Sequence, residues 1–203
     1  MLSVSSIPLA CSLSHRLFAL CRTMVLNMVK AVGLGQELRN WAMLWLTAYT
    51  FLLRVPSEAI PMCRGSPDDA ALAGKQTLIW REGDEVCIRM LRRKNKPKGS
   101  GVLRRKCCCQ QGARADIYSS LVCPVHTLWD RFFRLLPEGT EPWKDTTEKE
   151  ALAKLRELLG KLGIQHVEKY GTHDFRRGHA EARMSICSTH ILVQRLSIMF
   201  FRT

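Results

Sequence analysis

The sequence predicts an α+β fold that is mostly helical and contains a small three-stranded antiparallel sheet. Three observations lead to this class. Apolar residues recur at helical spacing up to residue 53, strand-like segments separated by turns follow between residues 77 and 107, and leucines at helical spacing return after residue 147. Hydrophobic residues make up 46% of the 203 residues, which is enough for a core and too much for a disordered chain.

The N-terminal part of the chain contains two predicted helices. Apolar side chains at helical spacing predict the first over residues 15–32, and two glycines break it. The second runs from about Leu38 to Leu53. Its apolar stretch of 13 residues from Trp41 is shorter than the ~18–20 residues of a membrane span. We therefore expect a buried helix rather than a membrane span, and this stretch predicts no membrane partner.

A loop and a β-meander follow the second helix. Prolines and glycines between residues 56 and 67 predict the loop, with at most a short helix from Ser57. A tight turn at residues 82–84 and a longer turn at residues 94–101 separate strand-like segments. The three predicted strands are Thr77–Arg81, Glu85–Leu91 and Val102–Cys107.

The C-terminal part returns to helices. Residues 124–135 are predicted to form one helix, which ends at a proline- and glycine-rich break. Thr147 and Glu150 fit a capping box, in which each side chain bonds a backbone amide of the other residue. The helix that they open carries leucines along one face. Thr172 is a suitable N-cap for one more helix, which begins at His173.

The charge of the chain points to a polyanionic partner. The formal net charge is +13, from 31 Lys and Arg against 18 Asp and Glu. Nine basic residues and no acidic one lie between Arg89 and Lys106. A basic β-hairpin can lie along a nucleic-acid backbone, so nucleic acid is the first candidate and an anionic membrane surface the second. An exposed hairpin kept soluble by its charge is the alternative.

Arg54 follows an apolar helix directly, which is an unusual place for a guanidinium group. Its stem leaves the core, so the charged end should have a fixed anionic partner. That partner is either a bound anion or Glu58, four residues further on. A purely structural Arg–Glu pair and a phosphate site are both open interpretations.

A second basic motif stands at the predicted helix start after Thr172. His173 and Arg176 are three residues apart, so they share one face of a helix. An imidazole and an arginine fork at a helix N-terminus suit a phosphate. A solvated basic helix end is the alternative.

These motifs, in this order, resemble the catalytic domain of the tyrosine recombinase (phage integrase) family. In that family an Arg after an apolar helix has an acidic residue beyond it, a Lys lies on a β-hairpin, and an H-x-x-R box begins a helix. Arg54, Lys94 and the pair His173 and Arg176 match these elements. Lys96 is the second choice for the hairpin lysine. The local sequences look most like recombinase domains of eukaryotic Crypton-type mobile elements.

The resemblance implies a mechanism and a partner. Arg54 and Arg176 would clamp the scissile phosphate and stabilise the charge of the transition state, while His173 assists proton transfer. Lys94 would be the general acid for the leaving 5′ oxygen. A tyrosine would form a 3′-phosphotyrosyl link, which requires no cofactor. Family members act on duplex DNA as homo-oligomers. The further residues expected to contact nucleic acid are Arg92, Arg93, Lys96 and Arg177.

The chain departs from the family at the nucleophile. Its three tyrosines, Tyr49, Tyr118 and Tyr170, all precede His173, whereas the family's nucleophile follows the H-x-x-R box. Residues 183–203 form an atypical apolar tail in place of that segment, as in a truncated or degenerate domain. We therefore expect DNA binding, and we do not expect strand cleavage by this chain alone.

The resemblance also divides the chain. Residues 21–182 are assigned to the recombinase-like domain, and residues 1–20 precede it as an extension. The first 36 residues contain no Asp or Glu, so the extension is either disordered or an organelle-targeting segment. Without such targeting, the expected location in a eukaryote is the nucleus.

Four residues outside these motifs have metal-ligand spacing. Cys107, Cys109, Cys123 and His126 form C-x-C-x13-C-x2-H, and three thiolates with one imidazole can complete a tetrahedral zinc site. The neighbouring Cys108 could replace one of the thiolates. The alternative is a set of free thiols in a basic loop. A zinc site would be structural, because four protein ligands leave no open position, and it would also suit a non-catalytic nucleic-acid-binding module.

Overall fold

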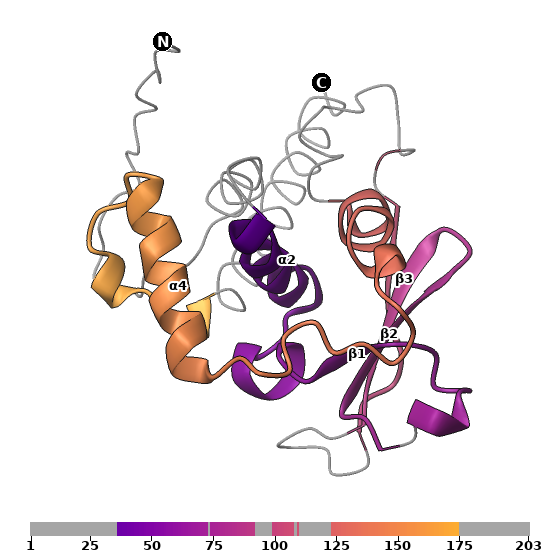
Figure 1. The fold of residues 1–203 in the computed structure, drawn as a ribbon. Helices are drawn as coiled ribbons and strands as arrows, with labels where there is room; N and C mark the ends of the chain where they lie inside the picture. The colour runs from indigo at the N-terminus through magenta and orange to yellow at the C-terminus, as the bar shows by residue number, and fades with distance from the viewer. Residues whose placement is uncertain (1–35, 73, 92–98, 108, 110–122, 175–203) are drawn as a thin grey trace, which may run out of the picture.

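A computed structural model of the chain describes residues 36–72, 74–91, 99–107, 109 and 123–174 (Figure 1). All of these lie within the predicted domain. The helix predicted over residues 15–32, the extension and the tail lie outside them. The class is α+β, as predicted. In Figure 1, helix α2 lies between helix α4 on one side and the sheet with its covering turns on the other.

The central element is α2 (Gln36–Phe51). Every residue from Trp41 to Phe51 is buried, which explains the absence of a polar face in this stretch. Thr47 lies in the core because its hydroxyl donates to the carbonyl of Met43 at 2.7 Å. The predicted buried helix is therefore confirmed.

The sheet has four strands rather than the predicted three, in the order β1-β2-β3-β4. The meander of β2 (Thr77–Glu82), β3 (Glu85–Met90) and β4 (Leu103–Lys106) is antiparallel, as predicted. The fourth strand, β1 (Met62–Arg64), pairs in parallel with β2, so the sheet is mixed. The sequence pattern missed β1 because its three residues follow a proline and show no alternation. Met62 and Cys63 are both fully buried.

The helix predicted over residues 124–135 is also wrong as a single element. The chain forms a π-helical segment, η4 (Pro124–Asp130), and then a 3₁₀ turn, η5 (Phe133–Leu135). Phe132 stacks on Trp143 at 5.6 Å, and Phe133 meets the same ring edge-on at 5.8 Å. Consecutive side chains on a regular helix point about 100° apart, so the break lets both rings reach one tryptophan.

Helix α4 (Glu148–Lys161) begins where the capping box predicts. The Thr147 hydroxyl accepts from the amide of Glu150 at 3.2 Å, and Leu155 and Leu159 are fully buried. Residues of α2, the sheet, η4 and α4 share one hydrophobic core. No helix in the described part of the chain has the length and hydropathy needed to cross a membrane.

Candidate functional site

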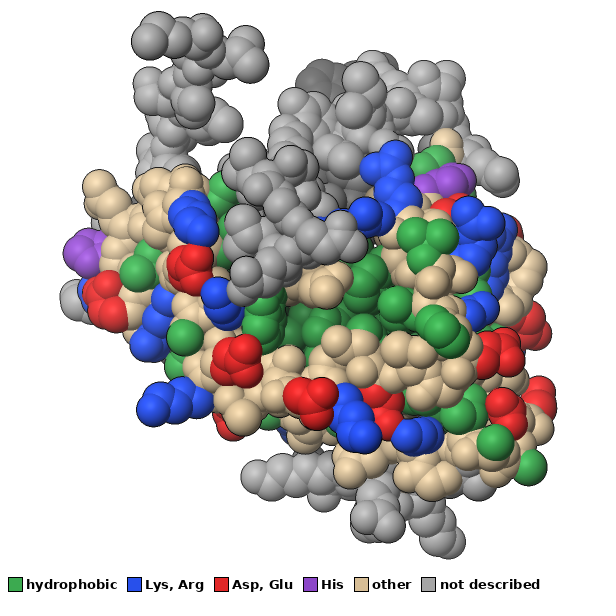
Figure 2. All heavy atoms as spheres, viewed as in Figure 1, with side chains coloured by type: hydrophobic (Ala, Val, Ile, Leu, Met, Phe, Trp, Pro, Cys, Tyr) green, Lys and Arg blue, Asp and Glu red, His purple; other side chains and the backbone are tan. Residues whose placement is uncertain are grey.

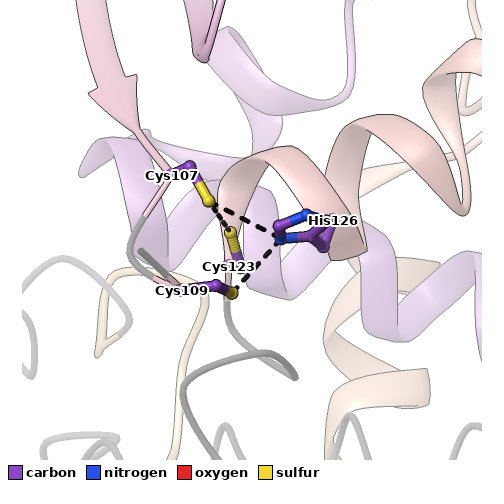
Figure 3. A group of neighbouring side chains, drawn as sticks. All are labelled: Cys107, Cys109, Cys123 and His126. Atoms are coloured by element: carbon purple, nitrogen blue, oxygen red, sulfur yellow. Dashed lines mark hydrogen bonds between the residues drawn. The ribbon is translucent and has the colours of Figure 1, made fainter. Parts of the chain in front are cut away.

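The four predicted metal ligands lie together, as Figure 3 shows. Cys107 directly follows β4, and Cys109 comes two residues later. Cys123 occupies the N-cap of η4, and His126 lies in the first turn of that element. Pro124 suits the first position of η4 because its missing amide would have no helical partner there. The cluster thus joins the end of the sheet to the start of η4.

The distances within this cluster are close to those that a tetrahedral metal site requires. The sulfurs of Cys107 and Cys123 are 3.7 Å apart, and Nδ1 of His126 is 3.6 Å from the Cys107 sulfur. Nδ1 is 3.2 Å from the Cys109 sulfur, and all four ligand atoms lie within 4.8 Å of one another. Tetrahedral zinc with ordinary bond lengths requires about 3.8 Å between sulfurs and about 3.6 Å between sulfur and nitrogen. The group could therefore hold a metal ion such as zinc.

The cluster is buried on one side and open on the other. Cys123 is fully buried and Cys107 is 5% exposed, whereas Cys109 is partly exposed and His126 is exposed. The amide of Cys107 donates to the carbonyl of Asp84 at 2.9 Å, which fixes the first ligand against the β2–β3 turn. Cys108 lies outside the described residues.

Two further cysteines in the described residues lie outside the cluster. Cys63 in β1 and Cys87 in β3 are buried free thiols. Burial is the main cause that raises the pKa of each of them, so they remain protonated at neutral pH. They are core residues and serve as internal controls for the cluster.

Arg54 is positioned by the end of α2. Leu52 adopts a left-handed conformation (φ 58°), and the amide of Leu53 donates to the carbonyl of Ala48 at 2.9 Å. These are the features of a Schellman motif, with leucine in the place usually held by glycine. The motif ends the helix and leaves Arg54 as the N-cap of the π-helical segment η2 (Val55–Ala59).

Glu58, one of the two partners that the sequence leaves open for Arg54, contacts it in the structure. Its carboxylate accepts from the Arg54 amide at 2.9 Å and from the guanidinium Nη1 at 3.3 Å. Glu58 is 1% exposed, while the Arg54 side chain is 25% exposed. One end of the guanidinium is therefore held from inside the protein while part of it reaches the surface.

His173 is exposed beside two buried neighbours, Thr172 and Asp174. The Asp174 carboxylate accepts from the amide of Gly171 at 2.6 Å. The preceding segment is attached to α4, because the Arg156 guanidinium donates to the carbonyl of Tyr170. Arg176 and Arg177 lie outside the described residues, so the structure does not place them relative to Arg54.

The predicted DNA contacts on the hairpin, Arg92, Arg93, Lys94 and Lys96, also lie outside the described residues. The hairpin base is described. The amide of Ser100 donates to the carbonyl of Met90 at 2.7 Å. Gly99 has a φ of +85°, and a Cβ there would come within 2.6 Å of the same carbonyl oxygen. This close approach explains the glycine at the end of the turn.

Acidic residues on the sheet neutralise part of the basic run, which the sequence pattern did not reveal. Arg104 in β4 bonds Glu82 at 2.6 Å and Glu85 at 3.3 Å. Arg105 donates to the carbonyl of Thr50 at 3.0 Å. On the face in Figure 2, Lys and Arg side chains lie among Asp and Glu side chains. The sequence alone could not show these contacts, because they depend on the register that places Glu82 opposite Glu85 and Glu85 opposite Lys106, next to Arg104 and Arg105.

Comparisons with protein-family models, curated proteins and solved structures found no match to this chain. Its function must therefore be inferred from its own side chains. In the described residues, two arrangements carry chemistry. One is the group of Cys107, Cys109, Cys123 and His126, and the other is Arg54 on its buried Glu58.

Proposed function

We propose that this protein binds duplex DNA as a tyrosine-recombinase-like domain of DNA recombination or integration. Its net charge of +13 favours a polyanionic partner. Its motifs follow the order of the family's catalytic boxes, with Arg54 after the central helix and His173 at the end of the described chain. The family's Crypton-type members are the ones its local sequences resemble.

The observation that carries this proposal is the setting of Arg54. A guanidinium presents five N–H donors in a fixed fork. The buried Glu58 accepts from one nitrogen, Nη1, and the side chain remains 25% exposed. The buried carboxylate orients the fork and leaves further donors for an outside anion. A phosphate oxygen of DNA is the anion that the resemblance implies.

In the proposed role, each matched residue has one task. In the family's reaction, Arg54 and Arg176 would hold the non-bridging phosphate oxygens, His173 would assist proton transfer, and Lys94 would protonate the leaving oxygen. A family nucleophile would follow the H-x-x-R box, and this chain has no tyrosine after Tyr170. We therefore propose DNA binding by this chain without strand cleavage.

We further propose that the Cys/His cluster holds structural zinc. Three thiolates and an imidazole are a common zinc ligand set, and four protein ligands leave no position for a substrate. The metal would join β4 to η4 across residues 110–122. This favours a second candidate function, a non-catalytic, zinc-stabilised nucleic-acid-binding module.

A binding titration tests the role of Arg54. We expect Arg54→Ala to lower affinity for a labelled DNA duplex by about tenfold or more, since charged hydrogen bonds contribute about 1.5–3 kcal/mol. Arg134→Ala is the matched control, because Arg134 is a 62% exposed arginine outside the predicted site. Equal losses in the two variants would show that Arg54 acts only through its charge, and the phosphate site would be wrong.

Two measurements separate the candidates. A nicked suicide DNA substrate traps a covalent adduct only if a tyrosine of this chain attacks the phosphate, and we expect no adduct. Metal analysis should find one zinc per chain, lost in Cys123→Ser and retained in Cys87→Ala. A metal-free wild-type protein that still binds DNA would remove the zinc-stabilised candidate.

A further inference from the structure

We propose that the Cys/His cluster is also a thiol switch, in which peroxide expels the metal and thereby weakens DNA binding. This inference rests on the proposed zinc site and the proposed DNA binding. It is carried by the unequal exposure of the thiols and by their mutual distances. The oxidant that the switch requires is a peroxide, which accepts two electrons.

The exposure of the ligands selects the sulfur that reacts first. Cys123 is fully buried and Cys107 is 5% exposed, so neither is open to solvent. Cys109 is partly exposed. Metal binding keeps the ligand thiols deprotonated, and oxidation follows thiolate character and exposure. Cys109 is therefore the point at which an oxidant enters the cluster.

The distances place a second thiolate within reach of the first. All four ligand atoms lie within 4.8 Å of one another, whereas a disulfide requires about 2.05 Å. Closing this gap requires the two sulfurs to approach each other by less than about 3 Å. Cys107 is only two residues from Cys109, so a bond between them would close a very small ring. Cys123 comes from a different element, η4, and is the better resolving residue.

The reaction balances with one peroxide per pair of thiolates. The Cys109 sulfur attacks a peroxide oxygen, the O–O bond breaks, and the departing hydroxide takes a proton to become water. This leaves a sulfenic acid on Cys109. The Cys123 thiolate then attacks that sulfur, the S–O bond breaks, and a second water leaves as the disulfide forms. Two thiolates lose two electrons, peroxide gains them, and the metal is left with two ligands.

Loss of the metal would act on the elements that the cluster joins. Cys107 directly follows β4, and Cys123 is the N-cap of η4, which packs against α2, β3 and β4. Strand β4 also forms one side of the hairpin base that carries the basic residues 92–98. Release of the metal would free both ends of the 110–122 connection. We expect β4 and the base of the hairpin to lose this support and DNA affinity to fall.

The experiment treats the full zinc-loaded chain with hydrogen peroxide and follows released zinc with a chromogenic chelator. Mass spectrometry after differential alkylation maps the oxidised cysteines. Cys109→His keeps four ligands, as in Cys2His2 sites, but removes the exposed thiolate. Cys87→Ala removes a buried thiol outside the cluster and is the control. Anisotropy with a DNA duplex is read before oxidation, after it, and after reduction with added zinc.

We expect wild type and Cys87→Ala to release one zinc per chain and to form a Cys109–Cys123 disulfide. Reduction with added zinc should reverse both changes. Cys109→His should bind zinc, and peroxide should release that zinc at least about tenfold more slowly than it does from the wild type. Equal rates of zinc release from wild type and Cys109→His, or zinc release without a disulfide, would overturn the proposed switch. Unchanged DNA affinity after release would overturn the coupling. Absence of DNA binding by the zinc-loaded protein would instead contradict the proposed function, while the zinc and thiol measurements would still decide the chemistry.

Discussion

Glu58→Gln provides a sharp test of the Arg54 arrangement. In the wild type, the carboxylate accepts from the Arg54 amide at 2.9 Å and from its guanidinium at 3.3 Å, and Glu58 is 1% exposed. Glutamine has nearly the same shape but no charge. One of its two polar ends is an NH2 donor, so it cannot accept both bonds. The substitution therefore removes charge-assisted bonding without opening a cavity.

The expected destabilisation is about 2 kcal/mol. A hydrogen bond to a charged group contributes about 1.5–3 kcal/mol, and breaking a fully buried ion pair costs about 3–5 kcal/mol. The lower range applies because the Arg54 side chain is 25% exposed and can be hydrated. For a domain of this size, 2 kcal/mol corresponds to a fall in Tm of about 6 °C.

Urea denaturation followed by circular dichroism measures this change, with Glu157→Gln as the control. Glu157 also forms an i,i+4 pair, with Lys161 at 2.7 Å, but the Glu157 side chain is 41% exposed. Exposed pairs of this type contribute about 0.5 kcal/mol or less. If both variants lost the same small amount of stability, the buried carboxylate would not be what holds Arg54.

Three further substitutions test the fold and the electrostatics. Thr147→Ala removes the cap of α4 and should lower the free energy of unfolding by about 1 kcal/mol in urea denaturation. Gly99→Ala brings a Cβ to 2.6 Å from the Met90 carbonyl at a φ of +85° and should lower Tm more than Thr147→Ala does. Hydrogen bonding to Arg104 lowers the pKa of Glu82 in the folded protein. The ionised carboxylate therefore stabilises the fold above about pH 4.3, the pKa of Glu82 in the unfolded chain, and this stabilisation is lost as the pH falls further. Glu82→Gln should therefore narrow the Tm difference between pH 7 and pH 3 relative to wild type.

The elements predicted correctly are those whose signals are local. The capping box of Thr147 and Glu150 lies within one helical turn, and the meander is marked by turns between neighbouring strands. Strand β1 pairs in parallel with β2. Its first residue, Met62, lies opposite Thr77, which is far from it in the sequence. Such pairing leaves no local pattern in the sequence, so the strand was missed.

The candidate sites follow the same rule. The spacing of Cys107, Cys109, Cys123 and His126 predicted that these side chains lie together, since two pairs of near neighbours need only one loop to bring them together. The pairing of Arg54 with Glu58, four residues further on, was one of the two interpretations that the sequence left open. The contacts of Arg104 in β4 reach Glu85 on the neighbouring strand β3 and Glu82 on β2, one strand further away. They could be recognised only after the strand register was known.

The central claim is that this chain binds duplex DNA through phosphate contacts, and the salt dependence of binding tests it most directly. Neutralising each phosphate contributes about −0.9 to the slope of log K against log salt. With nine basic residues between Arg89 and Lys106, we expect a slope of about −4 or steeper for a duplex of mixed sequence. Absence of binding at low salt, or an affinity that does not change with salt, would contradict the claim.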